Sequence, residues 1–379
     1  MRLFPLGGLC LALAWAPIAS AQIADSPVGA QGSPAADTGY FQIVRPVARG
    51  VWVFVQPKFQ TQPDGDVTVI EQHDGLVLVD AGGSPGSGRR IVRMVKSLSA
   101  KPVKAVVITQ WHGDKPQGLT EILKAWPAAR TISTVQTQAH LADPNTMNTP
   151  GAPDAARNAK YLEAVERQIG FFEKSRDAAK TDAEREGYDS AARMFRQYKL
   201  DMDGALTIAT KEGFTDRLTI ADPERPVEAM FLGRANTDGD AVVWLPKQKI
   251  VVAGEIVIAP FPYGFGSYPS DWIKTLAGLR AMPWRILIPG HGMPETNRLQ
   301  LDRISDVLKD VRRQVAPLVK QGLKLDQVKA KVDLAAHARA FCGDDRWCAL
   351  WFGRFFTDPI VASAVKEIRG EPIVQGLKG

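Results

Sequence analysis

Imidazole and carboxylate side chains occur in three short polar segments of this chain, each placed directly after an apolar run. His112 and Asp114 lie in the first segment, Glu255 in the second and His291 in the third. Imidazole nitrogens and carboxylate oxygens are the ligands that bind zinc and other divalent ions in proteins. These four residues are therefore candidate ligands of a divalent ion.

The apolar runs before these segments predict β-strands. Val103–Ile108 is short and fully apolar, as expected for a strand that is buried on both faces. Ile250–Ala253 and Ile286–Ile288 are similar. Ligand and catalytic residues tend to lie at the carboxyl ends of such strands, because the strand ends are rigid and the loops are free to vary. The three polar segments are therefore predicted to meet at one edge of a sheet.

Further strands and helices follow from the same patterns. Apolar and β-branched runs predict strands at 50–55, 67–70, 76–79, 131–134, 218–220, 227–232 and 241–245. Helical spacing of apolar residues predicts helices at 89–98, 119–125 and 272–282, and the chain from Leu299 onward is mostly helical. The strands come in two runs, each with helices. This order predicts two packed sheets with helices outside.

The stretch from Asp154 to Leu200 interrupts the alternation of strands and helices. Two amphipathic helices are predicted there, which would form an inserted hairpin. Their apolar stripes are Tyr161, Val165, Ile169 and Phe172, then Tyr188, Ala191, Phe195 and Tyr198. One interpretation is a helical pair packed on the core surface, and the other is a lid over the site.

Four segments occur in order, each just after a predicted strand: Asp80–Ser84, Thr109–Lys115, Gly233–Asp240 with Ala253–Glu255, and Pro289–Gly292. In this order and spacing the chain resembles the metallo-β-lactamase superfamily over about residues 45–297. The resemblance implies an α/β fold, a four-layer αββα sandwich of the metallo-β-lactamase type. The helical hairpin would be an insertion, and the C-terminal helices an extension.

The expected domain organisation starts with an exported leader. Arg2, the apolar run Leu3–Ile18 and Ala19-Ser20-Ala21 predict a signal peptide over 1–21, so the protein would be periplasmic or secreted. Residues 22–40 form a flexible leader, and 41–297 the metallo-β-lactamase-like domain, with 154–200 as the insertion. Residues 298–379 form a helical extension packed on the same domain. No stable membrane span is expected after signal removal.

The family's motifs imply a two-metal centre. A T-H-x-H-x-D-H loop, an A-H-T-x-G-D motif, a later G-D and a P-G-H-G hold two ions, and a water or hydroxide between them attacks the substrate. The chemistry is that of a bound ion, which lowers the pKa of its water and polarises the cleaved bond. Here His112, Asp114 and His291 match the pattern, and Glu255 replaces the bridging Asp. The substituted ligand positions are Gln110, Lys115 and Asn236.

These substitutions imply a reduced metal content. The first-metal set becomes Gln110, His112 and Asn236, and neutral amides are poor zinc ligands, so this site would be weak or empty. Two arrangements stay open for the second set. Either Asp114, Glu255 and His291 supply ligands for one Zn²⁺ or other divalent ion, with His112 as a further candidate ligand, or no ion binds and the Lys115 ammonium pairs with the two carboxylates. In the second case Lys115 would stabilise an oxyanion or bind an anionic ligand.

Two functions follow from this resemblance. The first is an exported hydrolase that cleaves an ester, lactam or related small molecule with at most one divalent ion, with Asp114 and Lys115 as catalytic residues. The alternative is a non-catalytic ligand-binding protein in which Lys115 replaces a metal ion. The loop Pro260–Tyr268 carries aromatic residues that would either line the substrate pocket or pack between strand and helix. The net charge of +6 is spread along the chain, so no nucleic-acid partner is expected.

The remaining candidates are predicted to be structural. Asp80 and Asp240 would cap loops by accepting backbone N–H bonds. His73 and His140 match no ligand motif, and His337 is expected at the surface. Cys342 and Cys348 are close together in an exported chain, which favours a short-loop disulfide.

Overall fold

The computed structural model describes residues 42–55, 64–143 and 155–373. The predicted signal peptide (1–21) and leader (22–40) lie outside the described residues. Within the described ranges, no helix combines the length and the apolar composition needed to cross a membrane.

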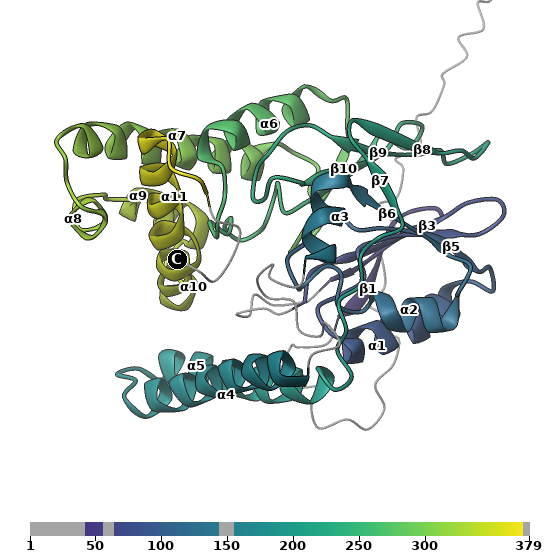
Figure 1. The fold of residues 1–379 in the computed structure, drawn as a ribbon, viewed down its shortest axis with the longest axis horizontal. Helices are drawn as coiled ribbons and strands as arrows, with labels where there is room; N and C mark the ends of the chain where they lie inside the picture. The colour runs from purple at the N-terminus through teal and green to yellow at the C-terminus, as the bar shows by residue number, and fades with distance from the viewer. Residues whose placement is uncertain (1–41, 56–63, 144–154, 374–379) are drawn as a thin grey trace, which may run out of the picture.

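Two sheets form the centre of the molecule (Figure 1). The first sheet has seven strands in chain order: β1 (Ile43–Ala48), β2 (Val51–Val55), β3 (Val67–Glu71), β4 (Leu76–Val79), β5 (Val103–Val107), β6 (Arg130–Thr134) and β7 (Glu212–Phe214). The second has five, in the spatial order β12 (Ile286–Pro289), β11 (Ile250–Gly254), β10 (Ala241–Leu245), β9 (Val227–Phe231) and β8 (Arg217–Ile220). A buried cluster with side chains from both sheets, including Val79, Val107 and Val243, fills the space between them.

Helices cover the outer faces of both sheets. A cluster with side chains from α1 (Pro85–Leu98), α2 (Leu119–Ala125) and α3 (Val135–Ala142) packs against the first sheet. The helices α6 (Pro269–Ala281) and α7 (Leu299–Lys320) pack against the second. The layers are therefore helix, sheet, sheet and helix, which confirms the predicted four-layer α/β sandwich.

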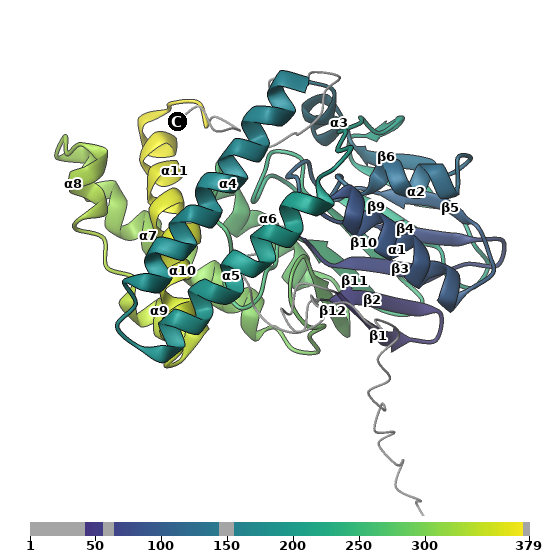
Figure 2. The same ribbon diagram turned by 90° about the horizontal axis from the view of Figure 1, so that it is seen from below.

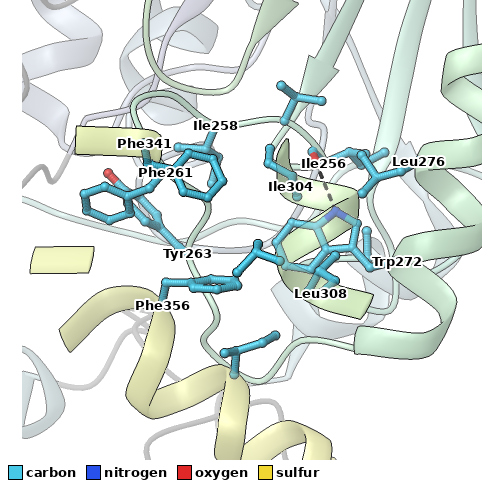
Figure 3. Close-up of a cluster of buried hydrophobic side chains, with 14 of the residues drawn as sticks. Ile256, Ile258, Phe261, Tyr263, Trp272, Leu276, Ile304, Leu308, Phe341 and Phe356 are labelled. Atoms are coloured by element: carbon cyan, nitrogen blue, oxygen red, sulfur yellow. Dashed lines mark hydrogen bonds between the residues drawn. The ribbon is translucent and has the colours of Figure 1, made fainter. Parts of the chain in front are cut away.

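The last helices extend the layer that covers the second sheet. They are α8 (Leu325–Lys329), α9 (Ala335–Cys342), α10 (Arg346–Trp351), the π-helical segment η2 (Phe352–Thr357) and α11 (Asp358–Arg369). Phe341 and Phe356 from these helices share one cluster with Phe261, Tyr263 and Trp272 (Figure 3). The Trp272 indole N–H donates to the carbonyl of Ile256 at 3.0 Å (Figure 3), which fixes the loop that follows β11.

The helix α1 starts four residues earlier than its apolar spacing predicts. Ser84 is its N-cap, since the side-chain hydroxyl accepts from the Ser87 N–H at 3.0 Å, and Pro85 occupies the first turn. The spacing rule missed this turn because its residues are small. Gly88 is needed there, since a Cβ on it would lie 2.5 Å from the carbonyl oxygen of Gly118.

The inserted hairpin consists of α4 (Ala155–Asp177) and α5 (Asp182–Asp201) and runs in Figure 2 from the helices of the first sheet to the C-terminal helices. One part of its apolar stripes, such as Val165 and Tyr198, holds the two helices together. Another part packs on the C-terminal helices, with ring centroids 5.7 Å apart between Phe172 and Trp351 and 5.0 Å apart between Tyr188 and Trp347. These contacts support the packed interpretation of the insertion.

Candidate functional site

The ends of three strands bring Asp114, Glu255 and His291 together. Asp114 lies in the loop after β5, Glu255 directly follows β11, and His291 follows β12. The Nε2 atom of His291 is 3.1 Å from Asp114 Oδ2 and 3.1 Å from Glu255 Oε1. One ligand atom from each of the three residues lies within 4.8 Å of the others, so this donor set can hold one divalent ion.

Asp114, Glu255 and His291 form the candidate metal centre, and His112 joins this centre through a contact with Glu255. Its Nδ1 atom is 3.4 Å from Glu255 Oε2, the carboxylate oxygen that does not face His291. Glu255 therefore bridges the two histidines. Its side chain is 2% exposed, whereas the side chain of His112 is 12% exposed. His112 is thus the more accessible of the two residues in this contact.

The Lys115 ammonium lies among the carboxylates. Its Nζ atom is 3.0 Å from Asp114 Oδ2 and 3.4 Å from Glu255 Oε1, and it donates to the carbonyl of Gly290 at 2.9 Å. The side chain is fully buried. An ammonium has three N–H bonds, and three acceptors surround this one.

Gly65 makes room for this ammonium. A Cβ atom at Gly65 would lie 2.2 Å from Lys115 Nζ and 2.8 Å from Asp114 Oδ2. The backbone N–H of Gly65 also donates to the carbonyl of Asp114 at 3.2 Å. The segment before β3 is therefore one wall of the centre, although it carries none of the motif residues.

Gln110 and Asn236 are both fully buried and border the centre through their neighbours. The side-chain oxygen of Gln110 accepts from the backbone N–H of His112 at 2.7 Å. The side-chain nitrogen of Asn236 donates to the carbonyl of Tyr263 at 2.6 Å. The other ends of both amides, Gln110 Nε2 and Asn236 Oδ1, have no hydrogen-bond partner among the described residues.

Charge compensation dominates the electrostatics of the centre. Burial disfavours the charged forms of His291, Glu255 and Lys115, yet their charged partners outweigh it. Burial and the Lys115 ammonium lower the pKa of His291, but its bonds to Asp114 and Glu255 raise that pKa to about 9. Burial opposes ionisation of Glu255, but Lys115 and the two histidines hold its pKa well below the usual range. Burial lowers the pKa of Lys115 and the surrounding carboxylates raise it, with a net rise.

Asp66 was not predicted as a site residue, and it lies beside His291. Its backbone N–H donates to the carbonyl of Gly290 at 2.9 Å, and its carboxyl accepts from the N–H of Gly292. Burial raises the pKa of Asp66 well above its usual range, although His291 and Lys115 oppose this rise. Only the turn-forming pattern Asp-Gly-Asp at 64–66 marks this segment in the sequence.

Two tyrosines also approach the carboxylates. The ring of Tyr263 lies 5.2 Å from the His291 ring, and its buried hydroxyl has no partner among the described residues. Burial raises the pKa of Tyr263, with further rises from Glu255 and Asp114. Burial also raises the pKa of Tyr161 in α4, where Asp114 again adds to the rise. The aromatic loop indicated Tyr263, but nothing in the stripe of α4 distinguished Tyr161 from its neighbours.

The aromatic loop 260–268 packs in the core at one end, which is one of its two predicted roles, and its role in lining a substrate pocket stays a prediction. Phe261 is fully buried in the core and contacts Phe352 at a centroid distance of 5.7 Å. Phe265 is 39% exposed and lies 5.5 Å from Phe355 and 6.4 Å from Tyr263. The loop is thus anchored in the core at one end and leaves an apolar wall beside His291 at the other.

Asp80 and Asp240 both take the structural role. Asp80 accepts from the backbone N–H of Thr109 at 2.8 Å, and Asp240 accepts from that of Thr237 at 2.5 Å. Each also accepts from the hydroxyl of the same threonine. The Asp80 bonds join the loops that follow β4 and β5, and the Asp240 bonds close the loop before β10.

The other predicted residues do not contact the candidate ligands directly, although the ring of His140 lies 5.0 Å from that of Trp111, whose ring is 4.4 Å from that of His112. His140 pairs with Asp238 at 2.9 Å, and His73 is exposed. His337 lies at the surface with its side chain 23% exposed, and its Nε2 is 3.1 Å from Asp310 Oδ2 on α7. Cys342 and Cys348 form a disulfide, with Cα atoms 5.5 Å apart.

Comparisons with known proteins agree with this architecture. Residues 61–291 match the family model of the metallo-beta-lactamase superfamily. A linear primary-alkylsulfatase from Pseudomonas sp. (strain ATCC 19151) is 22% identical over 293 residues, which cover 72% of this chain and 51% of that protein. A metallo-beta-lactamase type 2 from Bacillus sp. (strain 170) is 22% identical over 282 residues, covering 72% of this chain and 84% of that protein.

Solved structures share the fold. The stereoselective inverting sec-alkylsulfatase Pisa1 from Pseudomonas sp. superposes with a TM-score of 0.57 and 15% identity, over 88% of this chain and 51% of that one. The chain thus spans about half the length of both alkylsulfatases that it resembles. At these identities the structural likeness concerns the fold.

Proposed function

Because this chain belongs to the metallo-β-lactamase superfamily, a family of hydrolases, we propose that it hydrolyses a small-molecule ester with at most one divalent ion. The observation that carries the proposal is the position of Lys115. Its ammonium lies 3.0 Å from Asp114 and 3.4 Å from Glu255, two of the three residues that could hold the second ion of the family. A fixed positive charge therefore already balances these carboxylates.

The donor set at the first-metal position does not fit an ion. The unpartnered atom of Gln110 is an amide nitrogen, which donates hydrogen bonds and has no lone pair for a cation. His112 and the Asn236 oxygen remain, and a structural or catalytic zinc has three or four protein ligands. We derive no chemistry through an ion at this position.

The donor set at the second position fits one ion chemically. Asp114, Glu255 and His291 offer two carboxylates and one imidazole. An ion bound there would act as a Lewis acid and lower the pKa of a bound water. The Lys115 ammonium competes for the same carboxylates, so this binding would be weak.

The protein's own side chains supply the remaining functions. A neutral His112 that donates its Nδ1–H to Glu255 keeps Nε2 as an acceptor, the form that a general base requires. Glu255 orients this imidazole, as the third group of a catalytic triad orients the general base. Tyr263 and Phe265 form an apolar wall beside His291, which suits an ester with an apolar portion.

The choice of an ester comes from the relatives. Both alkylsulfatases align over most of this chain, and their names identify sulfate esters as substrates of those proteins. The metallo-beta-lactamases provide the second substrate class to be tested, a lactam.

The test is hydrolysis by purified protein with known metal content. The substrates would be p-nitrophenyl sulfate, p-nitrophenyl acetate and the lactam nitrocefin. We expect turnover of an ester with no more than one bound ion per chain, measured by mass spectrometry of the metals. His112→Ala is expected to lower kcat at least about 100-fold. His337→Ala, in a histidine that pairs with Asp310 of α7, is the matched control.

Two bound ions per chain, or no turnover at any metal content, would contradict the proposal. The second outcome would favour a non-catalytic ligand-binding protein, which is the alternative function. The observation behind this alternative is that Lys115 compensates the carboxylates without any ion. Metal-dependent turnover that is lost in Asp114→Asn but kept in Asp310→Asn, a carboxylate that pairs with His337, would exclude the alternative.

We further propose that the protein is exported to the periplasm or secreted. The sequence pattern of residues 1–21 and the Cys342–Cys348 disulfide support this location, since disulfides persist in oxidising compartments. Cell fractionation with N-terminal sequencing of the recovered protein tests the cleavage. Two free thiols in the denatured mature protein would show that Cys342 and Cys348 are not bonded, and the disulfide would then not support this location.

A further inference from the structure

A largely buried arginine lies between two carboxylates where α5 meets α1. The carboxyl end of α5 lies beside α1 (Figure 2), and Asp201 at that end accepts from Arg90 of α1 at 2.7 Å. On its other side, Arg90 Nη2 is 3.7 Å from Asp64 Oδ2. The side chains of Arg90, Asp201 and Asp64 are 17%, 9% and 1% exposed. These three charges are therefore largely shielded from water.

The Asp64 end of this triad belongs to the segment that forms one wall of the candidate metal centre. Asp64 Oδ1 accepts from the backbone N–H of Gly83 at 2.7 Å, in the loop after β4. The next residue, Gly65, lies so close to Lys115 that an added Cβ would be 2.2 Å from Nζ. The backbone that touches the ammonium is thus one residue away from a carboxylate that pairs with Arg90.

The charge of Arg90 stabilises Asp64 in this position. Burial raises the pKa of Asp64, and the Arg90 guanidinium opposes this rise. A buried carboxylate that loses its cation must either take up a proton or move toward water. Because Gly65 is the next residue in the chain, movement of Asp64 would displace the backbone that lies against the Lys115 ammonium.

We propose that Arg90 is a positioning residue of the centre, which acts through Asp64 to hold the Gly65 backbone against the Lys115 ammonium. Asp201 holds the guanidinium from the other side, so the inserted hairpin takes part in this positioning. The inference deepens the proposed function and rests on it in taking the position of Lys115 to matter for hydrolysis.

The test measures how well Lys115 is protected from an amine reagent. The full chain is treated with sulfo-N-hydroxysuccinimide acetate, and acetylation of each lysine is followed by peptide mass spectrometry. Lys115 should react slowly in the unchanged protein, because its side chain is fully buried. Arg90→Met should raise this rate at least about 10-fold, since loss of one partner of a buried ion pair favours local opening. Arg90→Lys keeps the positive charge, so Lys115 should react more slowly in it than in Arg90→Met.

Arg225→Met is the matched control. The Arg225 side chain is 11% exposed and donates to the carbonyls of Arg49 and Glu71, at the opposite end of β3 from Gly65. This variant also loses a largely buried guanidinium, and urea denaturation compares its stability with that of Arg90→Met. It should leave the acetylation rate of Lys115 unchanged, because the wall of the centre keeps its contacts.

A second variant keeps the inference testable if circular dichroism shows that Arg90→Met does not fold. Asp64→Asn keeps an acceptor for the Gly83 N–H but removes the charge that faces Arg90, and should also raise the Lys115 rate about 10-fold.

Four results would each overturn the inference. They are fast acetylation of Lys115 in the unchanged protein, an unchanged rate in the folded Arg90→Met or Asp64→Asn variant, equal rates in Arg90→Met and Arg90→Lys, and an equal rise in Arg225→Met. Acetylation requires no turnover. An inactive protein that shows the expected rates would therefore contradict only the proposed hydrolysis.

Discussion

At the scale of single residues, the main feature of the candidate metal centre is the positive charge of a lysine side chain. Lys115 is enclosed by Asp114, Glu255 and the Gly290 carbonyl, and its side chain is fully buried. A buried ammonium is tolerated only when anionic or acceptor groups satisfy it. The same enclosure explains why Lys115 is held away from free contact with a substrate in this structure. Its role in stabilising an oxyanion stays a prediction.

Lys115→Met should make the free carboxylates available to a metal ion. Removing one partner of a buried ion pair costs about 3–5 kcal/mol, so the free energy of unfolding should fall by that amount. Zn²⁺ should then restore stability more in this variant than in the unchanged protein, because Asp114, Glu255 and His291 remain. Urea denaturation with and without Zn²⁺ measures both effects.

Lys104→Met is the matched control for that variant. Lys104 pairs with Asp74, whose side chain is 66% exposed, so its loss should cost at most about 1 kcal/mol. Zn²⁺ should have the same effect on this variant as on the unchanged protein. Equal stability of Lys115→Met and Lys104→Met would show that the Lys115 ammonium does not compensate the carboxylates.

Asp80 should make the stability of the protein depend on pH. Burial raises its pKa from 3.8 to about 6, so the folded protein holds this proton more tightly than the unfolded chain. The folded state then binds more protons between about pH 4 and pH 6, and the Asp80 contribution falls as the pH rises through that window. Asp80→Asn should remove this part of the slope, since asparagine also adopts the left-handed backbone found here (φ 65°).

The measurement is the free energy of unfolding from pH 4 to pH 8 for both proteins. A shift of this size corresponds to about 3 kcal/mol. The difference between the variant and the unchanged protein isolates Asp80 from other titrating groups. Parallel curves for the two proteins would contradict the raised pKa.

At the scale of elements, the order of strands explains which site residues could be predicted. His112, Asp114, Glu255 and His291 each follow a buried strand, and parallel pairing of β11 with β12 places the last two side by side. Gly65 and Asp66 precede β3 instead and match no ligand motif, so only the folded structure brings them to Lys115 and His291. The sequence left two arrangements open, a bound ion or the Lys115 ammonium paired with the carboxylates, because the position of this ammonium depends on the path of this segment.

Gly65→Ala tests whether that segment determines the position of the ammonium. The added Cβ would lie 2.2 Å from Lys115 Nζ, so Lys115 must leave its three acceptors. We expect a loss of about 1–3 kcal/mol in the free energy of unfolding, typical of overpacking. The proposed hydrolysis should fall as well, because the added Cβ would lie 2.8 Å from Asp114 Oδ2.

The control for this variant is Gly170→Ala in α4. A Cβ at Gly170 would meet no atom within 4 Å, and alanine favours a helix over glycine. This variant should therefore gain about 0.5–1 kcal/mol. A change of the same sign in both variants would show that space at Gly65 is not limiting.

At the scale of the whole molecule, the predicted layers of helices and sheets agree with the structure. They could be predicted because they depend on regular patterns of apolar residues that extend over whole strands and helices. The sequence missed β1, α3 and β7, which are short or lie at the edge of a sheet. It also left the inserted hairpin between two interpretations. The contacts that decide its position, such as Tyr188 with Trp347, join segments that are far apart in the chain.

The same hairpin has a consequence for the way the protein loses its structure. At one end, Asp201 of α5 accepts from Arg90 of α1 at 2.7 Å, and farther along, Phe172 and Tyr188 pack on the C-terminal helices. The hairpin therefore contacts both the helix layer of the first sheet and the last helices of the chain, and it links these two parts. The protein should therefore unfold on heating in a single calorimetric transition. Trp347→Ala removes the contact with Tyr188 of the hairpin and should broaden or split that transition.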